Sequence, residues 1–464
     1  MIVAGGADDR MQALAGLEVA ARELMLFAAV GLLVGGVDDL LLDLLFLIRR
    51  LLGLRGVRLT DAALPATPRC RVAIFVPTWR ERHVIEPMLR TLLARVVGDY
   101  RVFVAVYQND PDTAAAVRAV ADARVRLVIN PHAGPTTKAD NLNQLWHAML
   151  AADAREGVAT RMVVLHDAED VAHPDELRVF DALIDRFDVI QLPVQPLVRD
   201  GVALIAGTYA DAFAESHGKT LVVRAALGAG LPLAGVGCAI ATDALRAIAA
   251  ARGGIAFDPG CLVEDYVAGL RLAELRFRAA FVRHHGARGL VAIGEFFPDT
   301  FGAAIRQKAR WMAGIALAGW DRTGWSRPSH LLDHWMRWRD RRALLAVVVL
   351  TAAYLAALLY GVVLGLLAWT GRAPVTTISP PGGLLGGNMA LLGWRMAVRV
   401  AFSWRAYGWR HAIGVPVRFV VGNAIDLAAA PLALKRYAQT WRGAPPVWDK
   451  TDHVFPDLPE AVAP

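Results

Sequence analysis

The feature that most constrains how this chain folds is a short acidic motif at the end of an apolar run. Residues 162–165 read Met-Val-Val-Leu, and Asp167, Glu169 and Asp170 follow them closely. An apolar run that ends in clustered acids is typical of a buried strand, and open α/β sheets bind ligands beyond such strand ends. Carboxylates this close repel one another unless a cation lies among them, so a hard divalent metal such as Mg²⁺ or Mn²⁺ is the natural partner, and a solvated acidic turn is the alternative, which is more common for such a motif taken alone.

Strand-like and helix-like patterns alternate through the region that surrounds this motif. Strands are predicted at residues 71–77, 101–107, 124–130, 161–166 and 188–192. Helices are predicted at residues 83–95 and 138–151. Strands that alternate with helices of this length predict βαβ units and a mostly parallel sheet, so the fold class is α/β.

The rest of the chain is apolar enough to enter a membrane. Hydrophobic residues make up 55% of the sequence, and the mean hydropathy is +0.38. Residues 343–371 carry no charge and predict the clearest transmembrane helix. Residues 24–48 predict an anchor, either one span or a shorter span that continues into an interfacial helix. Residues 388–402 are predicted to return as a second span, whereas residues 413–434 favour an interfacial or re-entrant helix.

Basic residues beside the apolar segments predict the orientation of the chain. Arg49, Arg50, Arg55 and Arg58 follow the first anchor and place the next domain in the cytoplasm. The net charge of +7 therefore indicates contact with membrane lipids, and no motif supports nucleic acid. The three cysteines have no paired spacing, so neither disulfides nor a zinc site is expected, and no cleavable signal peptide is evident.

These patterns divide the chain into five parts. The expected parts are an N-terminal membrane anchor with a juxtamembrane helix (1–60), an α/β domain (61–300), interfacial helices (301–342), a transmembrane helical pair (343–410), and an interfacial or re-entrant helix with a C-terminal tail (411–464).

Several polar residues are predicted to lie on the same sheet edge as Asp167. Thr78 and Glu81 end the first strand, and Asp110 follows the second. Lys138 opens a helix, where a lysine and free backbone N–H groups can meet a phosphate. Each pattern also has an ordinary explanation, as a turn or a helix N-terminus.

Two helical motifs complete the set. Glu264 and Asp265 open a later helix, where an acid is also common as a cap. Gln307, Arg310 and Trp311 share one face of a predicted helix at spacings of three and four. The alternative for that face is an aromatic and basic surface at the membrane interface.

In this order and spacing, the motifs resemble those of the processive, membrane-embedded family-2 glycosyltransferases, which include the cellulose and hyaluronan synthases. The family pattern is an Asp after the second strand, a D-x-D, an x-E-D and a Q-x-x-R-W. A closer resemblance is to the bacteriophage adsorption protein B (NfrB) family, and it lies in residues 130–140, 166–170, 215–219, 306–311 and 448–451.

The resemblance implies a GT-A (Rossmann-like) fold and inverting transfer from a UDP-linked sugar. Asp110 would contact the nucleotide base, with Thr78 and Glu81 lining that pocket. Lys138 would lie near the phosphates, and Asp167 would bind both donor and metal. The second acid of the D-x-D is Glu169 here, so the metal would be held by Asp167 and Glu169.

The resemblance also implies roles at the acceptor. Asp265, beside Glu264, would be the general base, whereas Gln307, Arg310 and Trp311 would serve the acceptor and the leaving pyrophosphate. The acceptor would be a growing glycan or a lipid-linked sugar at the bacterial inner membrane, with an outer-envelope partner for export. The alternatives are a single-addition transferase and a non-catalytic membrane receptor or assembly component.

One expectation concerns regulation. NfrB proteins can have a C-terminal domain that resembles cyclic-di-GMP sensors, and this sequence ends at Pro464 without one. Control by that nucleotide is therefore expected only through a separate subunit.

Overall fold

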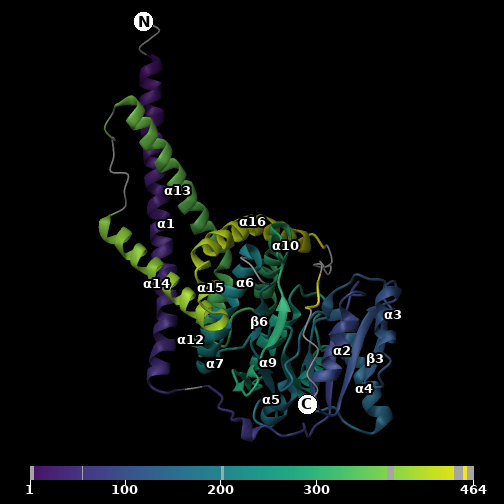
Figure 1. The fold of residues 1–464 in the computed structure, drawn as a ribbon. Helices are drawn as coiled ribbons and strands as arrows, with labels where there is room; N and C mark the ends of the chain where they lie inside the picture. The colour runs from purple at the N-terminus through teal and green to yellow at the C-terminus, as the bar shows by residue number, and fades with distance from the viewer. Residues whose placement is uncertain are drawn as a thin grey trace.

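A central sheet of seven strands organises the globular part of the chain in this computed structural model (Figure 1). The structure describes residues 5–54, 56–199, 203–371, 373, 381–443 and 453–456. Arg55 and residues 448–451, which the sequence analysis singled out, lie outside the described residues.

The strands of the sheet run in the order β3-β2-β1-β4-β7-β5-β8. β1 pairs in parallel with β2 and β4, β2 with β3, and β5 with β8, whereas β7 is antiparallel to both of its neighbours. Their bounds are β1 Val72–Pro77, β2 Tyr100–Tyr107, β3 Val125–Asn130, β4 Met162–Leu165, β5 Val189–Gln191, β7 Cys238–Ala241 and β8 Ala279–Phe281. The α/β class and the mostly parallel sheet are therefore confirmed.

Four shorter strands lie outside this sheet. β6 (Val194–Leu197) pairs in parallel with β11 (Ile293–Phe296), and β9 (His285–Gly286) pairs with β10 (Gly289–Leu290). An antiparallel bridge between Val171 and Gly294 fastens β11 beside the loop that follows the acidic motif.

Helices cover the sheet and complete the globular part. Every residue of β1 is buried, and α4 packs on β1 and β2. The helices of this part are α2 Ile85–Arg95, α3 Pro111–Ala119, α4 Lys138–Glu156, α5 Glu176–Leu183, α6 Leu204–Glu215, α7 Leu221–Ala226, α8 Thr242–Ala250, α9 Glu264–Glu274, α10 Phe301–Trp311, α11 Ala318–Thr323 and α12 Leu331–Arg341. A 3-10 turn, η1, covers Asp61–Ala63, and two π-helical segments, η2 (Ser216–Thr220) and η3 (Met312–Leu317), continue α6 and α10.

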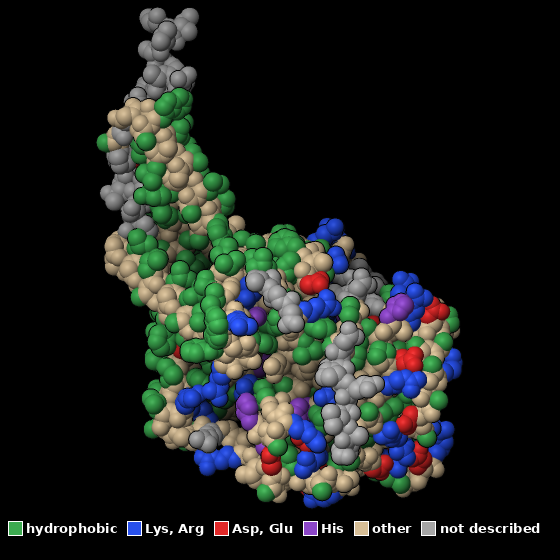
Figure 2. All heavy atoms as spheres, viewed as in Figure 1, with side chains coloured by type: hydrophobic (Ala, Val, Ile, Leu, Met, Phe, Trp, Pro, Cys, Tyr) green, Lys and Arg blue, Asp and Glu red, His purple; other side chains and the backbone are tan. Residues whose placement is uncertain are grey.

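Long helices extend from the globular part. α1 (Gly5–Leu51) packs along α13 (Ala343–Thr370) and against α14 (Gly382–Tyr407), and these helices project together (Figure 1). α16 (Val415–Trp441) follows the short α15 (Trp409–Ala412) and lies across the globular part beside α10. Figure 2 shows apolar side chains covering the projecting helices, whereas charged side chains gather on the α/β part.

Three helices in the described part of the chain are long and apolar enough to cross a membrane: Gln12–Leu51 within α1, Ala343–Thr370 and Val415–Trp441. By their length and composition, these segments indicate a membrane protein. α14, which we expected to be the returning span, is not among the three, and α16 meets the criterion although it lies across the globular part. The transmembrane pair over residues 343–410 and the interfacial placement of α16 remain predictions.

Candidate active site

The carboxyl edge of the sheet brings together residues from three of the predicted motifs. β1 and β4 are parallel neighbours, so Asp167 follows β4 on the edge where β1 also ends. Lys138, the first residue of α4, reaches this edge, and its Nζ lies 2.6 Å from Oδ1 of Asp167. The same Nζ lies 3.9 Å from Oε1 of Glu264, the first residue of α9. Lys138 therefore joins the acidic motif to the paired acids of α9.

The start of α4 is fastened to the loop before α9, which explains how Lys138 meets the α9 acids. Thr137, the N-cap of α4, donates its hydroxyl to the carbonyl oxygen of Pro259 at 3.0 Å. Asn143 exchanges two hydrogen bonds with the backbone of Phe257, at 2.7 and 2.9 Å. These side chains are buried, so their bonds fix the loop and the helix that follows it.

Crowded charges shift the pKa values of these groups. Burial lowers the pKa of Lys138, but Asp167, Glu264 and Asp265 outweigh burial and raise it well above its ordinary value. Burial raises the pKa of Glu264 to about 7, with Lys138 opposing the shift and Asp265 adding to it. Burial likewise raises the pKa of Asp265, and Lys138 again opposes the shift. A partly buried carboxyl pair whose pKa values are raised toward neutral pH is suited to proton transfer.

Gly235 brings backbone directly against this carboxyl pair. Its φ is +77°, and a Cβ at this position would lie 2.6 Å from Oδ2 of Asp265 and 3.3 Å from Nζ of Lys138. Only glycine combines this backbone conformation with so close an approach. The loop at Gly235 therefore forms one wall of the space around Asp265.

A second cluster forms around Glu169. Its Oε2 lies 3.2 Å from Nδ1 of His453, and Oε1 of Glu81 lies 3.0 Å from the same nitrogen. Burial raises the pKa of Glu169 to about 8, against the opposing charge of His453. Burial alone would lower the pKa of His453, but Glu169 and Glu81 raise it to about 9.

The donor atoms of this cluster fit a divalent metal. One ligand atom each from Glu81, Glu169 and His453 lies within 4.8 Å of the others. Two carboxylates and an imidazole can hold a divalent transition-metal ion, whereas Mg²⁺ prefers a set made of oxygen ligands. The two acids predicted to share a metal have different partners in the structure: Glu169 faces His453, and Asp167 faces Lys138.

The third acid of the motif, Asp170, points away from this cluster. Its Oδ2 lies 3.0 Å from Nδ1 of His166 and accepts a hydrogen bond from the backbone N–H of Asp167 at 2.9 Å. Nε2 of His166 lies 3.1 Å from Oε1 of Glu176. Burial lowers the pKa of His166, but Glu176 and Asp170 outweigh it and raise the pKa to about 10. This buried trio holds the loop in shape, and a structural role for Asp170 outside the metal's ligands stays a prediction.

The predicted base-binding residues lie where β1 and β2 end. Thr78 is fully buried and donates its hydroxyl to the carbonyl oxygen of Ala105 at 2.7 Å. Asp110 caps α3 and accepts a hydrogen bond from the backbone N–H of Arg80 at 2.6 Å. Arg80 adopts a positive φ of 57°, and its guanidinium lies 4.7 Å from the ring centroid of Trp79. Thr78 and Asp110 thus shape this loop.

The Q-x-x-R-W motif occupies α10. Among the described residues, the buried Oε1 of Gln307 has no hydrogen-bond partner. Arg310 is close enough to Asp265 to lower its pKa, although burial has the larger and opposite effect. Trp311 packs edge-on against Tyr209 at 5.8 Å between ring centroids. It also contacts the cluster that includes Val263, immediately before Glu264, so the motif lies beside the carboxyl pair.

Sequence patterns did not predict two residues of the site. His453 lies 284 residues after Glu169 (453 − 169) in the tail, and no spacing signal links it to the acidic motif. Glu295 lies on β11, and burial followed by Asp170, Glu169 and Asp167 raises its pKa well above the ordinary value. Alternation within residues 293–296 would have been the signal for this strand, but the run is very short.

Comparison with known proteins places the chain in a class. Residues 68–314 match the family model described as glycosyltransferase like family 2. The chain belongs to glycosyltransferase family 2, and its fold is that of the GT-A glycosyltransferases.

The chain is also similar to particular proteins. It is 34% identical over 476 residues to bacteriophage adsorption protein B of Escherichia coli (strain K12), and equally to bacteriophage N4 adsorption protein B of Escherichia coli O157:H7. These matches cover 96% of this chain, which spans 63% of the length of each relative. Among solved structures, the mannosyltransferase PcManGT from Pyrobaculum calidifontis, in complex with GDP-Man and Mn²⁺, superposes with a TM-score of 0.50. It is 18% identical, and the match covers 86% of this chain and 98% of that one.

Proposed function

We propose that the protein is an inverting glycosyltransferase that takes a sugar from a UDP-linked donor and adds it to a glycan of the bacterial envelope. The observation that supports this best is the convergence of Asp167, Lys138, Glu264 and Asp265 at one sheet edge. A membrane receptor without catalytic function would not need mutually repelling, partly buried carboxyl groups there, because they destabilise the fold.

The proposed reaction uses Asp265 as the general base. Asp265 takes the proton of an acceptor hydroxyl, whose oxygen forms the new bond to the anomeric carbon. The bond from that carbon to the donor phosphate breaks, and the nucleoside diphosphate leaves. A positioned carboxylate base of this kind contributes roughly 10²–10⁴ in rate. Arg310, which lies near Asp265, is placed to offset charge on the departing diphosphate.

A divalent ion, when bound, would neutralise part of the diphosphate charge. Glu81, Glu169 and His453 are the residues that we expect to hold it, with Asp167 close enough to influence the pKa of Glu169. We expect Mn²⁺, because Mg²⁺ prefers oxygen ligands alone and the structurally similar mannosyltransferase was solved in complex with Mn²⁺.

The membrane helices suggest where the reaction occurs. We propose that α1 and α13 cross the bacterial inner membrane and that the α/β part faces the cytoplasm, where nucleotide sugars are made. The acceptor would be a growing glycan or a lipid-linked sugar, because α10 lies beside both the carboxyl pair and α16. An outer-envelope partner would receive an exported product.

A donor screen tests the proposal. Purified protein in lipid vesicles is incubated with UDP-linked and GDP-linked sugars, with and without Mn²⁺, and nucleoside diphosphate release is measured. We expect Mn²⁺-dependent UDP release from one donor and its loss in Asp265→Asn. Product length on a gel then separates chain extension from single addition. If no donor is turned over, the non-catalytic receptor that the relatives' name suggests becomes the better explanation.

A further inference from the structure

α12 lies between the N-terminal helix α1 and the helix that begins with Glu264 and Asp265. Its contacts form two opposite stripes. Asp333, Arg337, Asp340 and Arg341 occupy one stripe, at spacings of four, three and one along the helix. Trp335, Arg339 and Arg342 occupy the other, at spacings of four and three.

The first stripe holds α9 near its beginning. The hydroxyl of Tyr266, a buried residue, donates a hydrogen bond to Oδ2 of Asp340 at 2.9 Å. The backbone N–H of Tyr266 donates to Oδ1 of Asp265 at 2.7 Å. Tyr266 therefore touches the proposed base through its backbone and α12 through its side chain.

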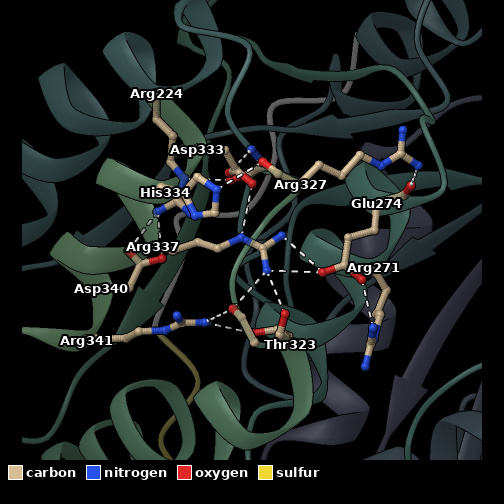
Figure 3. Close-up of polar contacts among 12 residues, drawn as sticks. Arg224, Arg271, Glu274, Thr323, Arg327, Asp333, His334, Arg337, Asp340 and Arg341 are labelled. Carbon is tan, nitrogen blue, oxygen red and sulfur yellow. Dashed lines mark hydrogen bonds and ion pairs between the residues drawn. The ribbon is translucent and has the colours of Figure 1, made fainter. Parts of the chain in front are cut away.

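The same stripe also holds α9 at its end. Arg337, which is fully buried, lies between Asp333 and Glu274 in Figure 3. Its Nε donates to Oδ2 of Asp333, and its Nη1 and Nη2 donate to Oε1 of Glu274, all at 3.1 Å. Because Tyr266 and Glu274 lie two helical turns apart, the two contacts fix both the position and the direction of α9.

The first stripe also contacts the loop that leads to Gly235, whose backbone lies against Asp265. Nη1 of Arg224 donates to both carboxylate oxygens of Asp340, at 2.7 and 2.9 Å (Figure 3). Nε of Arg224 donates to the carbonyl oxygen of Gly230 at 2.6 Å, and the N–H of Gly230 donates to Asp333 at 2.8 Å. This loop continues to Gly235, so Asp340 supports the position of Asp265 both through Tyr266 and through this loop.

The second stripe of α12 binds α1. Nε1 of Trp335 donates to Oδ1 of Asp38 at 2.6 Å, and Nη1 of Arg342 lies 2.8 Å from Oδ2 of the same residue. Nη2 of Arg339 lies 2.9 Å from Oδ1 of Asp39. One short helix thus links the membrane anchor to the catalytic helix through charge-assisted hydrogen bonds, which are the stronger kind.

We propose that Tyr266 and Asp340 are positioning residues for the general base, and that docking of α1 on α12 through Asp38 supports the same alignment. The N-terminal helix would then act in catalysis as well as in anchoring. The positioning role rests on the proposed function of Asp265. The structural link from α1 to α9 does not depend on that function. A buried network that served stability alone would leave the turnover of the folded enzyme unchanged.

The first test uses Tyr266→Phe, which removes only the hydroxyl, in the full-length protein in lipid vesicles. We expect kcat to fall roughly 10-fold to 100-fold with KM for the donor unchanged, as for a small misplacement of a catalytic group. Tyr437→Phe is the matched control, because its hydroxyl donates to Asp321 at 2.6 Å on an exposed surface. A kcat within twofold of the unmodified protein, for correctly folded Tyr266→Phe, would overturn the positioning role.

The second test follows the link from α1 without measuring activity. Hydrogen–deuterium exchange is compared between the unmodified protein and Asp38→Asn, with Glu23→Gln, an exposed acid of α1, as the control. We expect faster exchange in residues 229–237 and 264–267 only for Asp38→Asn. Faster exchange confined to α1 and α12 would refute the coupling. A protein that turns over no donor would refute the proposed function instead, and the exchange result would still decide whether the link exists.

Discussion

Replacing Glu169 with glutamine and, separately, Asp170 with asparagine tests the prediction that Glu169 is a metal ligand and that its neighbour Asp170 is not. Glutamine keeps the size of Glu169 but removes the charge that faces Nδ1 of His453 at 3.2 Å. Partners outside a metal's ligand set are worth about 10–100-fold in affinity or activity, so loss of a ligand should cost at least about 100-fold. The concentration of Mn²⁺ needed for half-maximal turnover should rise accordingly.

Asp170→Asn should instead cost stability. His166 then remains buried with Glu176 as its only acidic partner of the trio, and breaking a buried ion pair costs about 3–5 kcal/mol. The pKa of His166 is raised from 6.5 to about 10, so the stability from its ion pairs is fully present below about pH 6.5, declines as the pH rises and is lost above about pH 10. The stability difference between Asp170→Asn and the unmodified protein should therefore be smaller at pH 10.5 than at pH 7.5.

Two measurements on the same preparations distinguish a role in metal binding from a role in stability. Mn²⁺ titrations of UDP release report the metal, and denaturant unfolding at pH 7.5 and 10.5 reports stability. Equal loss of metal-dependent turnover in the two variants would mean that the assignment of Glu169 and Asp170 is wrong.

The remaining predictions concern the base, the glycine beside it and the metal. Burial raises the pKa of Asp265 and Lys138 opposes the shift, so turnover should rise with pH as this base ionises, and in Lys138→Met this limb should move to higher pH; a pH–rate profile checks both. Gly235→Ala should lower kcat by roughly 10–100-fold because Asp265 must move. The control is Gly228→Ala, which has a similar φ of +66° but nothing within 4 Å of the added Cβ. It shares only the backbone strain of about 1–2 kcal/mol. Removal of metal with a chelator should weaken UDP binding in calorimetry, and Mn²⁺ should restore it; UDP binding that does not depend on metal would contradict the proposed cluster.

β1 to β4 were readable from the sequence because each contains a run of apolar residues. The prediction at residues 71–77 differs from β1 (Val72–Pro77) by one residue, and β2 and β3 agree as closely. β7 and β8 were missed, because Cys238–Ala241 and Ala279–Phe281 are too short to show a period. β7 is also the antiparallel strand of the sheet, and no sequence pattern indicates its direction.

The sequence predicted which residues belong to the candidate site better than it predicted which of them face one another. The sequence placed Lys138 with phosphates and Glu169 with Asp167, because it reveals which edge a residue occupies and not which neighbour it faces. Pairing depends on distant segments: the Pro259 loop brings α9 to Lys138, and the tail brings His453 to Glu169. Such contacts arise from tertiary packing, which has no local signature.

The balance of charge in the site explains why these pairings matter. Its carboxyl groups outnumber its cations, and burial raises the pKa of Glu169, Glu264, Asp265 and Glu295 instead of leaving them readily ionised. A nucleoside diphosphate is itself an anion, so it would be repelled from this edge unless positive charge arrives with it. Lys138 cannot supply that charge alone, because its Nζ already lies among Asp167, Glu264 and Asp265. We therefore expect the donor and the divalent cation to bind together, because the acidic motif and its neighbouring carboxyl groups would repel the donor alone.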